Sequence, residues 1–236
     1  MMLYGVIAIS MVFGLIGKLV SGKLQKKFDQ YSRIPTSSGL SGKEVADRML
    51  SYYNIHDVQV LQGQGRLTDH YNPKSKVINL SPEVYGGRSI SAAAVAAHEC
   101  GHAVQHAEAY SMLQLRSAVV PLVQVSSNMQ KYLFMAGFML IGVIGNANFL
   151  LVCIALFAVT AFFSLVTLPV EFDASKRALA WLDNANITQG VEYDGAKDAL
   201  KWAAMTYVVG ATAAVAQLLY FLVIFLNSRD GGGQRA

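Results

Sequence analysis

The pentapeptide HECGH at residues 98–102 is the most informative stretch of this 236-residue chain. On a helix, side chains four residues apart share one face, so His98 and His102 can bind one zinc ion together. Glu99 beside them can take a proton from water that the ion activates. Two ordinary helix histidines are the alternative. Three of the five histidines fall within nine residues here, which favours a metal site.

The composition is that of a membrane protein. Hydrophobic residues make up 53% of the chain and charged residues 14%, about half the usual charged share of a globular protein. The net charge of +4 is therefore interpreted as a determinant of topology and lipid contact, and no nucleic-acid partner is expected. The two cysteines, Cys100 and Cys153, do not suggest a disulfide framework.

Uncharged runs predict four membrane-spanning helices. The first covers residues 3–20 and is expected to be an uncleaved anchor, because no basic residue precedes it. Residues 132–170 carry no charge, and a helix of that length is roughly 60 Å long, enough for two spans of about 30 Å. Residues 146–148, Asn-Ala-Asn, are the natural hairpin between these two spans. Residues 203–228 form the fourth.

The spans divide the chain into segments. We expect an anchor (1–22), a soluble portion with the HECGH helix (34–116), a helical membrane hairpin (117–170), a helical segment with a candidate third ligand (171–202), a transmembrane helix (203–228) and a flexible tail (229–236). Residues 116–131 are either a surface helix or an extension of the second span. Lys and Arg number 13 in residues 18–131, four in 176–201 and two beyond. By the positive-inside rule, the two basic segments lie in the cytoplasm and both termini lie outside.

The soluble portion shows both helix and strand signals. Ser41 and Glu44 form a capping box that opens a helix to about Tyr53. Strands are predicted at 58–61, 66–68 and 76–80, with a turn at 72–75. The metal helix begins after Ser89 or Ser91. A sheet that leads into a metal helix suggests an edge strand able to hold a peptide in extended form.

A catalytic zinc ion needs a third protein ligand and an open position for water. Glu171 is one candidate, 69 residues after His102 at the end of the third predicted span, where interfacial carboxylates are also common. Glu108 is the other, because it occupies the third-ligand place of the HExxHxxGxxH/D pattern. That pattern needs glycine where this chain has Gln105. His106 lies one turn after His102 and is expected to support the helix or the ligands.

Four blocks of sequence form a specific combination: LTDHY at 67–71, VINLS at 77–81, AAHECGHAVQH at 96–106 and LPVEFDAS at 168–175. They resemble the neutral zinc metallopeptidases of bacterial membranes that are often called YugP-like. The resemblance covers nearly the whole chain. It implies a membrane-embedded, gluzincin-like peptidase in which Glu171 is the third ligand.

The chain is also similar, more distantly, to HtpX-type membrane proteases. Their glutamate motif carries an aspartate four residues after the ligand, where this chain has Ser175, with Asp173 nearby. The groups that orient the metal histidines are therefore left open. His70 is a candidate to stabilise the oxyanion, and a histidine bonded only within its loop is the alternative. Asp69 is expected to be structural.

The expected fold is a mainly α membrane protein of about four transmembrane helices with a small α+β gluzincin-like zinc protease domain. The expected function is that of a zinc-dependent endopeptidase: His98, His102 and Glu171 bind Zn²⁺. Glu99 is the general base, and His70 is the candidate oxyanion stabiliser. The expected location is the cell membrane, multi-pass, with the active site on the cytoplasmic side. Expected partners are peptide or protein substrates, membrane proteins among them, and the lipid bilayer; the oligomeric state is left open.

Two other classes of protein fit the sequence less well. A non-catalytic metal-binding scaffold or sensor would keep the histidines, but metal ligation alone does not need Glu99. A transporter would place ionisable residues inside its spans, and the uncharged runs lack them.

Overall fold

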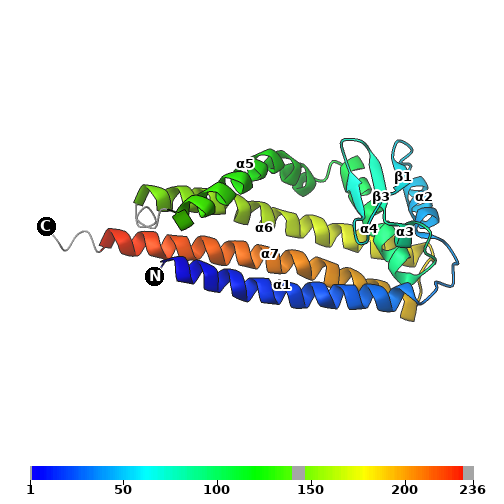
Figure 1. Cartoon of the computed structure of the whole chain (residues 1–236). Coiled ribbons are helices and arrows are strands. Elements are labelled where there is room, and N and C mark those ends of the chain that lie inside the picture. The colour runs from blue at the N-terminus through cyan, green and yellow to red at the C-terminus, as the bar shows by residue number, and fades with distance from the viewer. Residues whose placement is uncertain (1, 140–146, 231–236) are drawn as a thin grey trace. The chain divides into compact units, whose positions relative to one another are not determined.

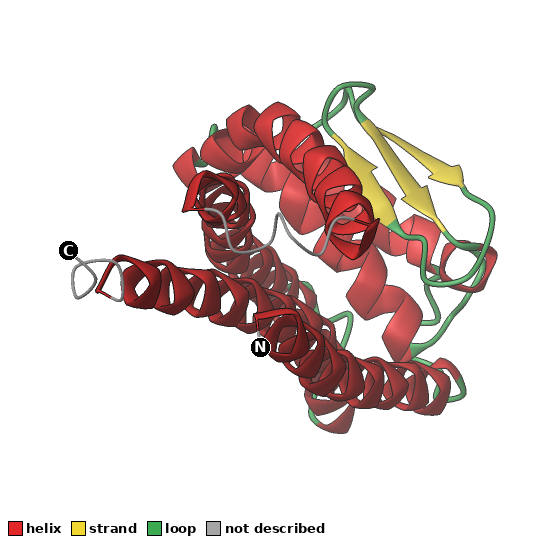
Figure 2. Ribbon diagram, turned by 60° about the vertical axis from the view of Figure 1, so that its left-hand side comes forward, coloured by secondary structure: helices red, strands yellow, loops and turns green. Residues whose placement is uncertain are grey.

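The structure is a computed structural model that describes residues 2–139 and 147–230. It is mostly helical, with one small three-stranded sheet (Figure 1 and Figure 2). Its elements are α1 (Met2–Ser32), α2 (Gly42–Tyr52), β1 (Gln59–Gln62), β2 (His70–Asn72), β3 (Val77–Leu80), α3 (Pro82–Tyr85), α4 (Ile90–Ala107), α5 (Ser111–Met139), α6 (Ala147–Asn184) and α7 (Val191–Asp230). Asn146 of the predicted hairpin and the predicted tail beyond Asp230 lie outside the described residues.

Two compact units make up the chain. The helical unit comprises Met1–Lys18, Leu115–Leu168 and Tyr207–Ala236, and the mixed unit comprises Leu19–Gln114 and Pro169–Thr206. The long helices α1, α6 and α7, which Figure 1 shows from end to end, each contribute residues to both units. The mixed unit contains the sheet, the HECGH helix and Glu171, so every candidate zinc ligand belongs to it.

Three of the described helices are long and apolar enough to cross a membrane. The candidate spans are Tyr4–Ser32, Asn148–Asn184 and Val191–Ser228. They cover the first predicted span, apart from residue 3, and contain the third and fourth. The second falls partly on residues 140–146, beyond the described residues, so the count of four stays a prediction. The helix α5 runs unbroken from Ser111 to Met139, so residues 116–131 are not a separate helix; that they extend a second span stays a prediction.

The helical unit has its own apolar core and a set of hydrogen bonds between α5 and α6. The core consists of Val6, Leu150, Cys153, Phe157 and Phe221. Between α5 and α6, the carbonyl of Leu156 accepts hydrogen bonds from Ser126 Oγ at 2.9 Å and Gln130 Nε2 at 3.0 Å. Gln130 Nε2 also donates to Thr160 Oγ1 at 2.8 Å. Such bonds join helices where lipid tails offer no hydrogen-bond partner.

In the mixed unit, α2 begins with the predicted capping box. Ser41 Oγ accepts from the Glu44 backbone N–H, and the Glu44 carboxylate accepts from the Ser41 N–H at 2.8 Å. The hydrogen bonds that the Glu44 carboxylate accepts from the N–H and the hydroxyl of Ser41 hold its pKa below its ordinary value. The buried face of α2 packs on α4, where Cys100 Sγ donates to the Ala46 carbonyl at 3.6 Å. Cys100 is therefore a packed core residue, and burial raises the pKa of its thiol.

The sheet has the order β1-β3-β2, with β1 parallel and β2 antiparallel to the central β3. Ile78 and Leu80 of β3 are fully buried in the core that the sheet shares with α4. The predicted strand at 66–68 is wrong. Gly65 and Leu67 have φ angles of 87° and 55°, in the left-handed region that a strand does not adopt. The strand lies four residues later, as β2.

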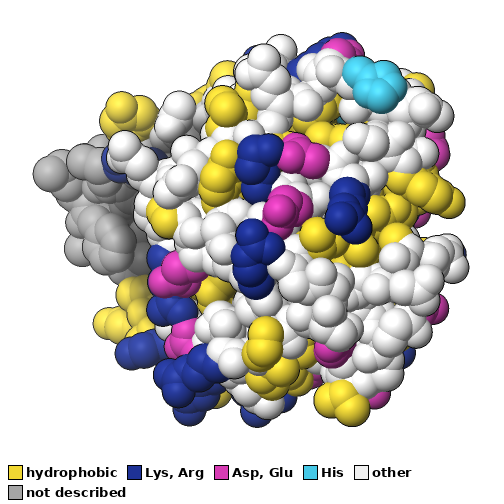
Figure 3. Space-filling view, turned by 90° about the vertical axis from the view of Figure 1, so that its right-hand side faces the viewer, with side chains coloured by type: hydrophobic (Ala, Val, Ile, Leu, Met, Phe, Trp, Pro, Cys, Tyr) yellow, Lys and Arg dark blue, Asp and Glu magenta, His cyan; other side chains and the backbone are white. Residues whose placement is uncertain are grey.

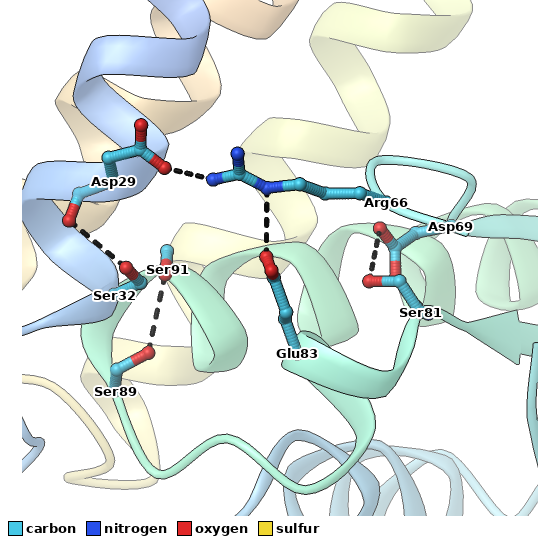
Figure 4. A network of polar contacts seen from close by, with 8 residues as sticks. All are labelled: Asp29, Ser32, Arg66, Asp69, Ser81, Glu83, Ser89 and Ser91. Atoms are coloured by element: carbon cyan, nitrogen blue, oxygen red, sulfur yellow. Dashed lines mark hydrogen bonds and ion pairs between the residues drawn. The ribbon is translucent and has the colours of Figure 1, made fainter. Parts of the chain in front are cut away.

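Acidic and basic side chains are interspersed on the face drawn in Figure 3. Many of the cations in the mixed unit have a carboxylate partner. Arg66 contacts Asp29 of α1 and, at 3.0 Å, Glu83 of α3, so one side chain from the loop before β2 ties two helices together (Figure 4). Lys27 pairs with Asp198 at 2.7 Å.

Candidate metal centre

The HECGH helix is α4, and the residue that caps it is Ser89. Its Oγ accepts a hydrogen bond from the Ala92 backbone N–H at 3.3 Å. Of the two predicted capping residues, Ser89 and Ser91, the helix therefore uses Ser89. The helix then runs unbroken to Ala107. It is buried along most of its length, because its alanines pack closely against α2 and the sheet.

The two histidines of the pentapeptide meet Glu171 of α6. The imidazole centroids of His98 and His102 are 4.8 Å apart. Glu171 Oε2 lies 3.4 Å from His98 Nε2 and 3.6 Å from His102 Nε2. Ligand atoms around one tetrahedral zinc ion, each at about 2.0–2.1 Å from it, are separated by about 3.3 Å. The three side chains therefore fit a zinc ion in both donor type and spacing.

A glycine allows α6 to come this close. Gly101 lies between the two histidines, and a Cβ atom built on it would be 2.6 Å from the carbonyl oxygen of Ala174. Real Cβ atoms do not approach a backbone oxygen so closely. Val170 and Ala174 are fully buried at this contact, and Glu171 between them is 3% exposed. The absence of a side chain at Gly101 thus lets α6 place a carboxylate beside the two imidazoles.

The imidazoles are held by side chains outside the ligand set. Gln105 Oε1 lies 3.0 Å from His102 Nδ1, while Gln105 Nε2 donates to the Val170 carbonyl and to Asp173 Oδ2, both at 2.8 Å. Because Gln105 Oε1 can only accept, His102 Nδ1 carries a proton and Nε2 is left for a metal ion. Ser175 Oγ lies 3.1 Å from His98 Nδ1 and orients that ring, although a hydroxyl can either donate or accept and does not by itself set the tautomer.

Gln105 is the functional residue that sequence reasoning missed. It entered only as a departure from the glycine of another pattern, yet it is completely buried. A signal was present: residues three apart on a helix are neighbours, and Gln105 is three residues after His102. Ser175 and Asp173, which the sequence left open, supply one contact each.

The charge at the site favours a cation. Burial lowers the pKa of His102, but the hydrogen bonds to Glu171 and Gln105 and the negative charges of Glu99 and Glu171 together raise it by more, so the pKa lies above its ordinary value. The attraction that favours a proton between these groups also favours a metal ion in the same place. Glu99 is buried beside them, at 7% exposure.

Glu108 and His106 lie in other interactions. Glu108 caps the C-terminus of α4, and its half-exposed carboxylate pairs with Arg177 Nη1 at 2.6 Å. Glu108 could reach the histidines only if the chain turned at Gln105. The helix α4 continues past Gln105 to Ala107, so the chain does not turn there. His106 Nδ1 lies 2.8 Å from the hydroxyl of Tyr71.

His70 is exposed at the start of β2, an edge strand of the sheet. Its Nδ1–H donates to the Thr68 carbonyl at 2.8 Å, and its Nε2 lies 3.3 Å from the Asn79 amide nitrogen. Both ring nitrogens thus have local partners. Asp69 is structural in its contacts: its carboxylate accepts from the Ser81 N–H at 2.7 Å and from the Ser81 hydroxyl, and burial raises its pKa.

Known proteins resemble this chain along most of its length. Residues 6–226 match the sequence model of a family described as "putative neutral zinc metallopeptidase". The chain belongs to this family. It is also 43% identical over 208 residues to the "putative membrane protease YugP" of Bacillus subtilis (strain 168), an alignment that covers 88% of this chain and 91% of that protein. The family resemblance carried by the four sequence blocks is confirmed. No solved structure matches the chain.

Proposed function

We propose that this protein is a zinc-dependent endopeptidase of the cell membrane. One observation carries the proposal: α4 and α6 bring His98, His102 and Glu171 to a single point, with the buried carboxylate of Glu99 directly beside the first ligand. The family description and the name given to the Bacillus relative support the same activity.

In this mechanism His98, His102 and Glu171 hold the zinc ion. A bound zinc ion supplies a Lewis acid that polarises a peptide carbonyl and makes water more acidic. Glu99 takes the proton from the attacking water and passes it to the leaving amine. Gln105 keeps His102 in the tautomer and orientation that ligation needs.

We also propose that substrate binds in extended form along β2, the edge strand that begins with His70. His70 would stabilise the oxyanion. For this role its Nε2 must exchange Asn79 for the substrate and carry the proton that Nδ1 now donates to Thr68. The substrates are peptides or proteins, and membrane proteins are included because the catalytic helix α6 is also a candidate span.

The location of the site follows from charge. The two basic segments of the chain, residues 18–131 and 176–201, hold 13 and four of its 19 Lys and Arg residues. We propose that both segments and the metal centre lie in the cytoplasm and that four spans place both termini outside.

The substitution Glu99→Gln tests the function. We expect the variant to bind as much zinc as the wild type and to cleave an unfolded reporter such as fluorescent casein at least about 100-fold more slowly, because a general base is lost while every ligand stays. Zinc content by atomic spectroscopy and the cleavage rate are measured on the same purified samples.

The matched control is Glu108→Gln, the same chemical change on the exposed carboxylate of the same helix. It should keep both zinc and activity. Full activity of Glu99→Gln would contradict the mechanism. A wild-type protein that binds zinc and cleaves nothing would favour the metal sensor or scaffold instead.

A further inference from the structure

A groove of about 380 Å³ lies between α6 and α7 within the mixed unit. Its lining combines three lysines with apolar side chains: Lys176, Lys197 and Lys201, and Phe172, Leu179 and Leu200. The cations are exposed, and Phe172 is half exposed. The groove therefore offers positive charge and apolar surface side by side.

The three lysines differ from two cations nearby in the mixed unit. Arg177 of α6 is paired with Asp173 and Glu108, and Lys27 of the neighbouring α1 is paired with Asp198 of α7. In the described part of the chain, none of the groove lysines forms an ion pair, and no carboxylate lines the groove. Lys197 and Lys201 are four residues apart on α7, where like charges repel each other and destabilise the helix. An anion in the groove would relieve that repulsion.

The apolar part of the groove lies at the border of the spans in sequence. Phe172 comes two residues after the uncharged run 132–170, and Ala204, which also lines the groove, comes one residue into the uncharged run 203–228. The lysines lie within a few residues of these two positions. This order, apolar next to the span and cationic just beyond it, matches the order of groups in a phospholipid, from acyl chain to phosphate.

We propose that the groove binds an anionic phospholipid of the membrane. The phosphate lies against Lys176, Lys197 and Lys201, and the acyl carbons nearest the headgroup cover Phe172 and Leu179. A free phosphate ion would leave this apolar surface uncovered, and a neutral phospholipid would leave the excess of positive charge. Ser175 also lines the groove and contacts His98, so the lipid site borders the metal centre.

Native mass spectrometry of the full chain in detergent tests the proposal. The protein is titrated with equal amounts of phosphatidylglycerol and phosphatidylcholine of the same acyl chains. The wild type should retain phosphatidylglycerol in preference to phosphatidylcholine. The triple variant Lys176→Gln, Lys197→Gln, Lys201→Gln should lose roughly 100-fold in affinity for phosphatidylglycerol, since each of the three lysines contributes roughly fivefold. Its zinc content and melting temperature report whether it folds; if it does not, Lys197→Gln alone should lose roughly fivefold.

A matched triple variant controls for total charge. Arg33→Gln, Arg48→Gln, Lys74→Gln removes three exposed cations outside the groove and should retain phosphatidylglycerol like the wild type. Equal losses in both triple variants would overturn the site, because bulk charge would then explain binding. Unchanged retention by the groove variant would overturn it as well. Complete displacement of the lipid by inorganic phosphate would assign the groove to a free anion. None of these readouts depends on peptidase activity.

Discussion

The buried amide of Gln105 shows how much of the metal centre depends on single side chains other than its ligands. It accepts a hydrogen bond from His102 and donates hydrogen bonds to Val170 and Asp173. One residue of α4 therefore both orients an imidazole and binds α6. The sequence indicated the ligands, because the spacing of the two histidines and the block around Glu171 are informative. The spacing of Gln105 from His102 hinted at a contact with that histidine, but the sequence could not indicate the partners of Gln105 on α6, because they are 65 and 68 residues away and only the fold brings them together.

Replacing Gln105 by Ala should lower zinc affinity about 10–100-fold, because His102 loses the acceptor that orients its ring. Competition with a chromophoric chelator measures the affinity. The control is Gln30→Ala, which makes the same change on an exposed helix position of α1. Affinities that are equal for the Gln105 variant and the wild type would show that the hydrogen bond has no part in zinc binding.

At the scale of elements, the site depends on how closely α4 and α6 pack. Glu171 was predicted at the end of a span, yet α6 continues through Pro169 and Glu171 to Asn184 without a break. The sequence did not show this, because a proline and the first charges after a long uncharged run are typical of a helix end. The strand expected at 66–68 failed for a related reason: a left-handed backbone at Leu67 cannot be recognised from residue type alone.

Gly101→Ala should disrupt this packing. The new Cβ atom would be 2.6 Å from the Ala174 carbonyl oxygen. The Cβ atom is fixed to the backbone of α4 and the oxygen belongs to the backbone of α6, so the helices must separate. We expect a destabilisation of about 1–3 kcal/mol, typical of overpacking, together with weaker zinc binding. Thermal unfolding in detergent and zinc content are the measurements.

Gly22→Ala is its control, because no atom lies within 4 Å of a Cβ atom at that position of α1. Alanine is the better helix former there, so this variant should be as stable as the wild type or slightly more stable. A Gly101 variant that behaves like the Gly22 variant would show that α4 and α6 do not need the glycine.

For the whole molecule, composition indicated the membrane class, and the three described helices long enough to span a bilayer agree with it. Hydropathy identifies such segments well because lipid cannot hydrogen-bond to the backbone, and an apolar helix satisfies its own backbone groups. It does not reveal which parts form compact units. The mixed unit joins residues 19–114 to residues 169–206, and this depends on packing between α4 and α6 that no local pattern encodes.

The proposed orientation can be tested in intact cells. Single cysteines introduced as Ser38→Cys and Asn186→Cys should resist a membrane-impermeant thiol reagent, whereas Ala147→Cys should react, because the basic segments are expected inside. The native Cys100 and Cys153 are buried and should contribute little background. The reverse labelling pattern would place the metal centre on the outer face.

The most direct test of the metal centre compares zinc content in two glutamate variants. Glu171→Ala removes a carboxylate 3.4 and 3.6 Å from the two histidine nitrogens, and Glu108→Ala removes one that pairs with Arg177. After purification in the same zinc-containing buffer, we expect Glu108→Ala to hold about one zinc ion per chain and Glu171→Ala to hold almost none. If Glu108→Ala empties the site and Glu171→Ala keeps its zinc, the centre formed by α4 and α6 is not the zinc site.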